Sequence, residues 1–126
     1  MNVLLVAAGG GIGAVLRYLI GIFLAVRLGP DFPWGTFFVN VTGSFLIGIV
    51  LVLVEDGTLS PEARLFLAVG ILGGYTTFST YSYEAVQLMA NGEELKTLMY
   101  IFGQVFACFL GAYLGLIGGR SLLGGA

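Results

Sequence analysis

The chain has 126 residues, of which 58% are hydrophobic and only 10% are charged, with a formal net charge of -2. Soluble domains carry about a quarter charged residues, and a chain this short has too few interior positions to bury so much apolar surface. The composition therefore excludes an ordinary soluble enzyme and a disordered chain, and it predicts an integral membrane protein. Only five Lys and Arg residues are present, and they form no basic patch, which excludes nucleic acid as a partner.

Four apolar stretches cover residues 3–26, 34–54, 65–89 and 98–119 of a single domain, 1–126. Each matches the roughly 20 residues that an α-helix needs to cross the hydrocarbon core of a bilayer. Backbone polar groups in lipid must be hydrogen-bonded internally. We therefore expect an all-α integral membrane fold with four transmembrane helices, joined by short polar connections. Ser60 followed by Pro61 is typical of a helix start and marks the beginning of the third stretch.

The first stretch contains one charged residue, Arg17. An arginine inside a membrane is costly and usually faces a cavity or a partner, unless its long side chain reaches the interface. Two interpretations are open. The guanidinium extends to the membrane surface, or it places a positive charge beside a water-filled vestibule that attracts anions.

The second stretch contains one amide side chain, Asn40, near its beginning. A polar side chain at this depth commonly forms a hydrogen bond with a neighbouring helix. The same amide also carries two N–H donors that could bind an anion stripped of water. The sequence is compatible with either role for Asn40.

The third stretch has the most specific pattern, GGYTTFSTYSYE, which begins at Gly73. Two glycines followed by two threonines are poor helix formers, and we expect the third helix to be broken near residues 73–77. Unwound backbone at membrane depth is tolerated only where it is buried in protein or lines a cavity, and broken helices present carbonyl groups to ions. Phe78 and Tyr81 follow one helical turn apart, and the positive edges of their rings can face an anion.

The fourth stretch contains a regular stripe of small residues, each four positions from the last: Gly103, Ala107, Gly111, Gly115 and Gly119. Small residues let helix backbones approach closely in lipid, where no hydrophobic force drives helices together. The stripe therefore predicts a tight helix–helix contact.

Four spans place Arg64 and Arg120 on one side of the membrane, and Arg27 and Lys96 on the other. Orientation normally follows an excess of Lys and Arg on the cytoplasmic side, and here the two sides are equal. Either the insertion machinery resolves a weak bias, or both orientations insert and pair as an antiparallel homodimer.

The GGYTTFSTYSYE segment, with Asn40 in VNVTGSF and Arg17 in a G-x-x-x-R pattern, resembles the Fluc (CrcB-type) fluoride channels over the whole chain. The resemblance implies a fluoride-selective ion channel that exports fluoride passively across the cell's inner (plasma) membrane as a multi-pass protein and relieves fluoride toxicity. It further implies an antiparallel, dual-topology homodimer in the lipid bilayer. Each dimer would have two pores and a central structural sodium ion, Na+.

The resemblance also implies roles for individual residues. The backbone carbonyls of Gly73 and Thr76 would bind the sodium ion. The family usually has phenylalanine at the position of Tyr81, and its pattern includes Glu84 without an assigned role here. The residues that would line the pore or bind fluoride are Arg17, Asn40, Phe78, Ser79, Thr80, Tyr81 and Gln104.

These side chains suit fluoride on chemical grounds as well. Fluoride is small, strongly hydrated and a powerful hydrogen-bond acceptor, so a filter must supply donors that replace its water. Amide N–H groups, hydroxyls and ring edges are such donors. Transport should be passive, because the chain leaves no room for a nucleotide site.

Two other functions are weighed against a fluoride channel. Small multidrug-resistance exporters also have four short helices and dual topology, but they bind lipophilic cations through a first-span carboxylate, where this chain has Arg17. A non-transporting subunit of a larger complex would be favoured only if the third helix were unbroken. An enzyme is not expected, because the chain has no His, no cysteine pair and no intramembrane carboxylate pair.

Overall fold

The structure is a computed structural model that describes residues 1–124, and every element within that part is helical. Three long helices are apolar enough to cross a membrane: α1 (Asn2–Leu28), α2 (Trp34–Glu55) and α6 (Glu94–Leu122). The remaining passage is divided into α3 (Pro61–Arg64), the π-helix η1 (Leu65–Leu72), α4 (Gly73–Tyr75) and α5 (Phe78–Ala90). These elements confirm four helical passages, each close to a predicted apolar stretch.

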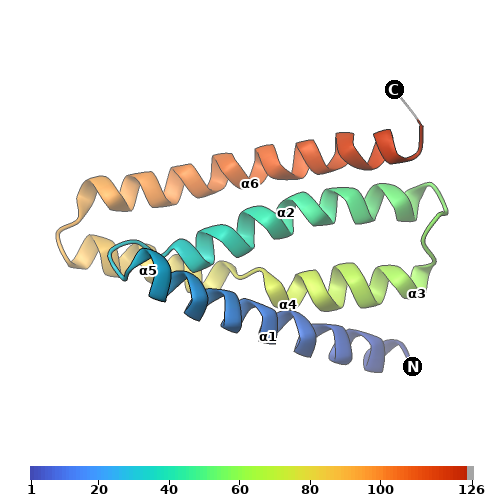
Figure 1. Cartoon of the computed structure of the whole chain (residues 1–126), viewed down its shortest axis with the longest axis horizontal. Coiled ribbons are helices and arrows are strands. Elements are labelled where there is room, and N and C mark those ends of the chain that lie inside the picture. Colours follow the sequence, from blue (N-terminus) through green and yellow to red (C-terminus); the bar gives the residue numbers. More distant parts are fainter. Residues whose placement is uncertain (125–126) are drawn as a thin grey trace.

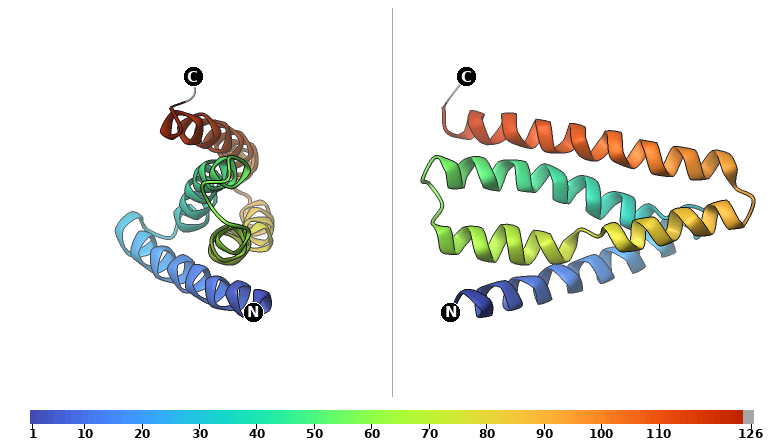
Figure 2. Two further views of the ribbon diagram at one scale, coloured as in Figure 1. Left: turned by 90° about the vertical axis from the view of Figure 1, so that its right-hand side faces the viewer. Right: turned by 180° about the vertical axis from the view of Figure 1, so that it is seen from behind.

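The passages run alternately in opposite directions (Figure 1). The start of α1, the α2–α3 connection and the end of α6 lie at one end of the molecule, as the four predicted spans require. In the views of Figure 2, α1 and α6 lie at the outer edges, with α2 and the third passage between them. The third passage is therefore flanked by α1 and α2, and α6 packs mainly along α2.

The helix ends follow local sequence signals. The Ser60 hydroxyl accepts a hydrogen bond from the Ala63 N–H at 3.1 Å, which confirms the predicted cap of the third passage. α1 ends at Leu28 and is followed by Gly29, whose φ of 84° lies in the left-handed region that glycine tolerates best. The three long helices extend past the predicted stretches by one to four residues at five of their six ends, and α2 begins at Trp34 as predicted.

Close backbone contact at glycines joins the helices. A Cβ added at Gly115 would lie 2.0 Å from the backbone oxygen of Phe45, and one added at Gly48 would lie 2.5 Å from that of Ala112. α1 packs against η1 in the same way through Gly9 and Gly13. Gly111, Gly115 and Gly119 of the predicted small-residue stripe thus form the α2–α6 contact, whereas a Cβ at Gly103 would meet nothing within 4 Å.

The third passage is interrupted at two residues, Thr76 and Thr77. Their backbones are extended, with φ and ψ of -86° and 155° at Thr76 and of -150° and 121° at Thr77. The break near residues 73–77 is therefore confirmed, but Gly73 and Gly74 themselves remain helical. The π-helix before the break was not predicted, because an apolar run such as LFLAVGIL carries no pattern that separates π from α geometry.

Large apolar side chains cover the outside of the molecule. Leu19, Phe102 and Phe106 are each more than half exposed. The buried hydrophobic residues form two small clusters, around Val39 and around Tyr100. An aqueous surface would not present so many large hydrophobic groups, whereas lipid tails would solvate them. The exposed face therefore fits the lipid bilayer predicted as the protein's surroundings.

The glycine contact between α1 and η1 can be tested by Gly13→Ala. The added methyl group would lie 2.0 Å from the Ile71 backbone oxygen, so the two helices must separate. We expect the free energy of unfolding to fall by about 1–3 kcal/mol, measured by denaturant unfolding in detergent. Gly11→Ala is the matched control, because a Cβ there meets nothing within 4 Å. Equal losses from the two substitutions would contradict this contact.

Candidate functional site

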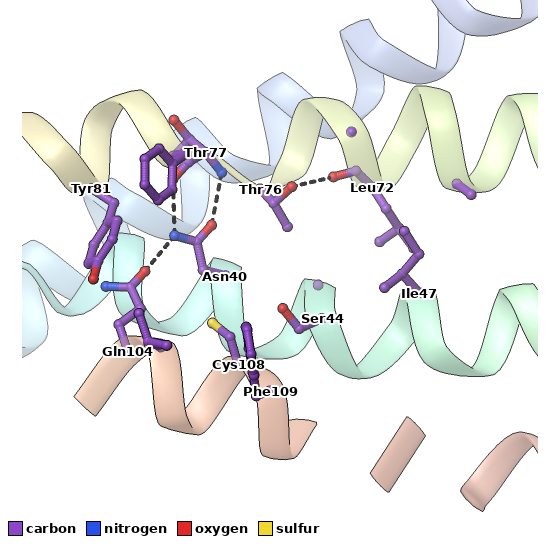
Figure 3. Close-up of a pocket in the computed structure, with 15 residues that line it drawn as sticks. Asn40, Ser44, Ile47, Leu72, Thr76, Thr77, Tyr81, Gln104, Cys108 and Phe109 are labelled. Carbon is purple, nitrogen blue, oxygen red and sulfur yellow. Dashed lines mark hydrogen bonds between the residues drawn. The ribbon is translucent and has the colours of Figure 1, made fainter. Parts of the chain in front are cut away.

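A cavity of about 380 Å³ lies beside the break in the third passage, between α2, α5 and α6 (Figure 3). Apolar side chains and glycines form most of its wall. The polar groups on the wall are gathered near the break: Asn40, Ser44, Thr76, Thr77, Tyr81, Gln104 and Cys108. An apolar cavity with a few converging polar groups is typical of a site for a small ligand or ion.

Asn40 of α2 binds the unwound backbone directly. Its Oδ1 accepts a hydrogen bond from the Thr77 N–H at 2.8 Å, and its Nδ2 donates to the Thr77 carbonyl at 3.0 Å. In a continuous α-helix the Thr77 N–H would donate to the carbonyl of Gly73. Asn40 therefore replaces, from a neighbouring helix, bonds that the break removes. This geometry confirms the interhelical hydrogen bond considered for Asn40.

Gln104 of α6 completes a chain of amides with Asn40. Its Oε1 accepts a short hydrogen bond from the Asn40 Nδ2. The side chain is only 2% exposed, and within residues 1–124 its Nε2 has no hydrogen-bond partner. A buried polar group without a partner is rare in folded proteins. The Gln104 amide is thus fixed at one end by Asn40 and lies buried beside the cavity.

Thr77 also begins α5, with its hydroxyl as the cap. Its Oγ1 accepts from the Thr80 N–H at 3.2 Å and lies 3.1 Å from the Thr80 hydroxyl and 3.3 Å from that of Ser79. Neither Ser79 nor Thr80 lines the cavity. The three hydroxyls instead form a polar cluster at the positive end of the α5 dipole, directly beside the break.

The rings of Phe78 and Tyr81 lie on one face of α5, as their spacing predicts, and they contact each other. Their centroids are 5.4 Å apart with an interplanar angle of 62°. Phe78 is 75% exposed at the mouth of the cavity, whereas Tyr81 is buried and its hydroxyl donates to the Ile101 carbonyl at 2.6 Å. The hydroxyl that distinguishes Tyr81 from phenylalanine is therefore used to hold α5 against α6.

Arg17 lies against the other side of the third passage and is not part of the cavity wall. Its Nε donates to the Gly74 carbonyl at 3.1 Å. That carbonyl would bind the Phe78 N–H if the helix continued. The side chain thus points toward the break and caps the helix that ends there, so its contacts do not support extension to the membrane surface.

Gly73 and Thr76 both line the cavity, and their carbonyls lose their usual donors at the break. The Thr77 N–H turns to Asn40, and the Thr80 N–H turns to the Thr77 hydroxyl. Within residues 1–124, no group of three or more His, Cys, Asp or Glu residues could hold a metal ion. A cation at this position would therefore depend on backbone and hydroxyl oxygens, which suit hard cations.

The chain is similar to known proteins over most of its length. A family model described as CrcB-like protein, Camphor Resistance (CrcB), matches residues 4–116. The chain belongs to the CrcB family. Three relatives share the name fluoride-specific ion channel FluC. One from Thermus thermophilus is 55% identical over 98% of this chain and 94% of its own. One from Rhizobium meliloti is 50% identical over 91% of this chain and 93% of its own. One from Agrobacterium fabrum is 46% identical over 97% of this chain and 98% of its own.

Membership of the CrcB family confirms the resemblance found in the sequence. Two features of this CrcB site were nevertheless missed by sequence reasoning. Thr77 binds Asn40 and caps α5, and its only signal was its place in the helix-breaking pair TT. Glu84, which had no assigned role, accepts a hydrogen bond from the Tyr100 hydroxyl at 2.8 Å, and no spacing in the sequence indicates this pair.

Proposed function

We propose that the chain is a fluoride-selective ion channel that exports fluoride passively across the cell's inner (plasma) membrane and relieves fluoride toxicity. The observation that carries the proposal is the match to relatives named fluoride-specific ion channels, at 46–55% identity over 91–98% of this chain.

The geometry supports the same chemistry. Fluoride exchanges its hydration shell for donors in a narrow path, and selectivity follows from the width of the path and the placement of those donors. The cavity offers the Asn40–Gln104 amides and the ring edges of Phe78 and Tyr81. The Ser79 and Thr80 hydroxyls lie beside it and extend the polar path.

Arg17 contributes in a different way, through its charge. It binds the backbone of the break from the side opposite the cavity. Within residues 1–124, the one ion pair joins Lys96 and Glu93, so no carboxylate pairs with Arg17. Its positive charge therefore raises the local concentration of anions near the break.

The rival function, a small multidrug-resistance exporter, is less well supported. Such a protein would need an available carboxylate for lipophilic cations. Glu84 is the one carboxylate within the predicted spans, and it is bound by the Tyr100 hydroxyl. A non-transporting subunit is also disfavoured, because the third helix is broken and polar.

The proposal includes an antiparallel, dual-topology homodimer with two pores. Phe78 and Phe109 line the cavity, yet they are 75% and 76% exposed on a single chain. A second copy packed against this face would close each cavity into a pore, and two-fold symmetry would give two of them. The equal Lys and Arg counts of the two sides favour a partner of opposite orientation.

The proposal also includes a central structural sodium ion held by the carbonyls of Gly73 and Thr76. Both carbonyls are released from helical bonding at the break, and broken helices in membranes coordinate sodium in this way. We expect an experimental structure of the dimer to show cation density between the two breaks, and little effect of Thr76→Ala, which keeps the carbonyl. Lack of any such density would contradict the proposal.

Fluoride flux from liposomes, recorded with a fluoride electrode and with chloride as the comparison ion, tests the function. We expect the wild-type protein to pass fluoride and not chloride. Phe78→Ile should reduce the flux about tenfold or more, because it removes the ring edge but keeps the apolar bulk. Tyr81→Phe should lose much less, because it keeps the ring, and the hydroxyl that it removes donates to Ile101.

Ser82→Ala is the control for these variants, since its hydroxyl bonds back to Phe78 in its own helix and does not line the cavity. Wild-type flux in Phe78→Ile would show that the anion does not pass this ring.

Orientation can be tested by charge. Several lysines added to the α2–α3 connection should fix one orientation of the chain. We expect this variant alone to be inactive and to regain fluoride flux when expressed with a variant biased the opposite way. Full activity of the first variant by itself would contradict antiparallel assembly.

A further inference from the structure

A second hydrogen bond, besides those of Asn40, joins α2 to the broken passage. The Tyr75 hydroxyl lies 2.9 Å from the Thr42 hydroxyl of α2. Tyr75 is the last residue of α4, directly before the break, and it is only 7% exposed. Neither Thr42 nor Tyr75 lines the cavity, so the proposed fluoride path does not account for this buried pair.

The direction of this hydrogen bond follows from the other bond that Thr42 makes. The Thr42 hydroxyl has one proton, which it donates to the Phe38 carbonyl at 2.7 Å. The Tyr75 hydroxyl is therefore the donor, and Thr42 Oγ1 is the acceptor. A buried hydroxyl without an acceptor would cost free energy. The bond thus ties the C-terminal end of α4 to α2.

Close packing encloses Tyr75 from two sides. A Cβ added at Gly13 of α1 would lie 2.8 Å from the Tyr75 backbone nitrogen. One added at Gly43 of α2 would lie 3.3 Å from the Tyr75 ring and would clash with the methyl group of Thr76. Tyr75 is therefore held between α1 and α2, and little space is left for the end of α4 to move.

Asn40 holds the residue on the other side of Thr76. The Thr76 carbonyl and the Thr77 N–H belong to one peptide unit, which is trans, and in a planar trans unit the C=O and N–H bonds point in opposite directions. The Asn40 Oδ1 accepts from the Thr77 N–H at 2.8 Å, so the Thr76 carbonyl points away from that oxygen. Side chains of α2 thus hold both neighbours of Thr76.

We propose that Thr42 and Tyr75 are positioning residues for the cation at the break, because their hydrogen bond holds the Thr76 carbonyl in the direction in which it binds the ion. This inference rests on the sodium ion of the proposed function and adds two residues to its site. A carbonyl that could turn would face the ion for only a fraction of the time, and the apparent affinity would fall by that fraction. The Thr42–Tyr75 bond limits this motion at the α4 end, as Asn40 does at Thr77.

The first test is Tyr75→Phe in the full-length protein, which removes the hydroxyl and keeps the ring. Dimer assembly is measured by gel filtration in detergent over a range of NaCl and, separately, of LiCl, with N-methyl-D-glucamine chloride keeping the ionic strength constant. We expect the sodium concentration that gives half of the dimer to rise about threefold to tenfold, the effect of one hydrogen bond. At high sodium, assembly and fluoride flux should return to the wild-type level.

The comparison of the two cations separates positioning from stability. A carbonyl that can turn closes more easily on the smaller Li⁺, since the choice between cations depends on the size and rigidity of a site. The preference of the wild type for Na⁺ over Li⁺ should therefore shrink in Tyr75→Phe. A purely structural role would shift both half-saturating concentrations by the same factor, and that result would overturn the proposal.

Tyr18→Phe is the matched control, because it makes the same change at a tyrosine of α1 that is 67% exposed. Its half-saturating concentrations should equal those of the wild type. Thr42→Val removes the acceptor and keeps the shape of the side chain. It should have an effect at least as large as Tyr75→Phe, because it leaves the buried Tyr75 hydroxyl without a partner. Thr42→Ser keeps the acceptor and should behave like the wild type.

The second test is a double-mutant cycle between Thr42→Val and Tyr75→Phe. The two residues act through one hydrogen bond, which can be lost only once, so the double variant should need no more sodium than Thr42→Val alone. Shifts that multiply in the double variant would show that the two side chains act independently and would overturn the proposal.

The failures are distinguishable. A wild-type protein that passes no fluoride would refute the channel function itself. A wild-type dimer that forms equally well without sodium would refute the cation site and this inference with it. A sodium-dependent wild type that Tyr75→Phe leaves unaltered would refute only the role of Thr42 and Tyr75. Circular dichroism in detergent establishes that each variant is folded. If Tyr75→Phe fails to fold, the comparison of Thr42→Val with Thr42→Ser still decides the proposal.

Discussion

The hydrogen bonds between Asn40 and the backbone of Thr77 are the interaction on which the site depends. A helix can be broken at membrane depth only if other groups replace its lost bonds. Asn40 replaces them at Thr77, Arg17 at the Gly74 carbonyl, and the Thr77 hydroxyl at the start of α5. Each of these polar groups beside the break therefore has a structural partner.

Glycine contacts make this arrangement geometrically feasible. Asn40 and Gln104 have short or medium side chains, so α2, α6 and the broken passage must lie close together for a continuous chain of hydrogen bonds. Gly115 and Gly48 bring α6 onto α2, and Gly13 brings α1 onto η1. In lipid such contacts replace the hydrophobic effect as the source of helix association. The hydrogen bonds of the polar site consequently depend on the close helix contacts that the small residues allow.

The sequence predicts the four passages, the Ser60 cap and the break, because length, apolar runs and poor helix formers are local properties. It also predicts from their spacing that Phe78 and Tyr81 lie one helical turn apart on one face. It does not predict the π-helix, the use of the Tyr81 hydroxyl, or which atoms Asn40 and Gln104 bind. These depend on the register between passages, which is set by close packing and carries no local signal. For the same reason Arg17 has a partner that neither of its two interpretations included.

The bond between Asn40 and Thr77 has a consequence for the order in which the protein is made. The chain is synthesised from its N-terminus, so α2 precedes the third passage into the bilayer. The amide that Thr77 needs is therefore already in the membrane when the interrupted segment arrives. Gln104 enters last, on α6, and joins an amide whose direction is already set. Synthesis therefore delivers the three partners in the order Asn40, Thr77 and Gln104.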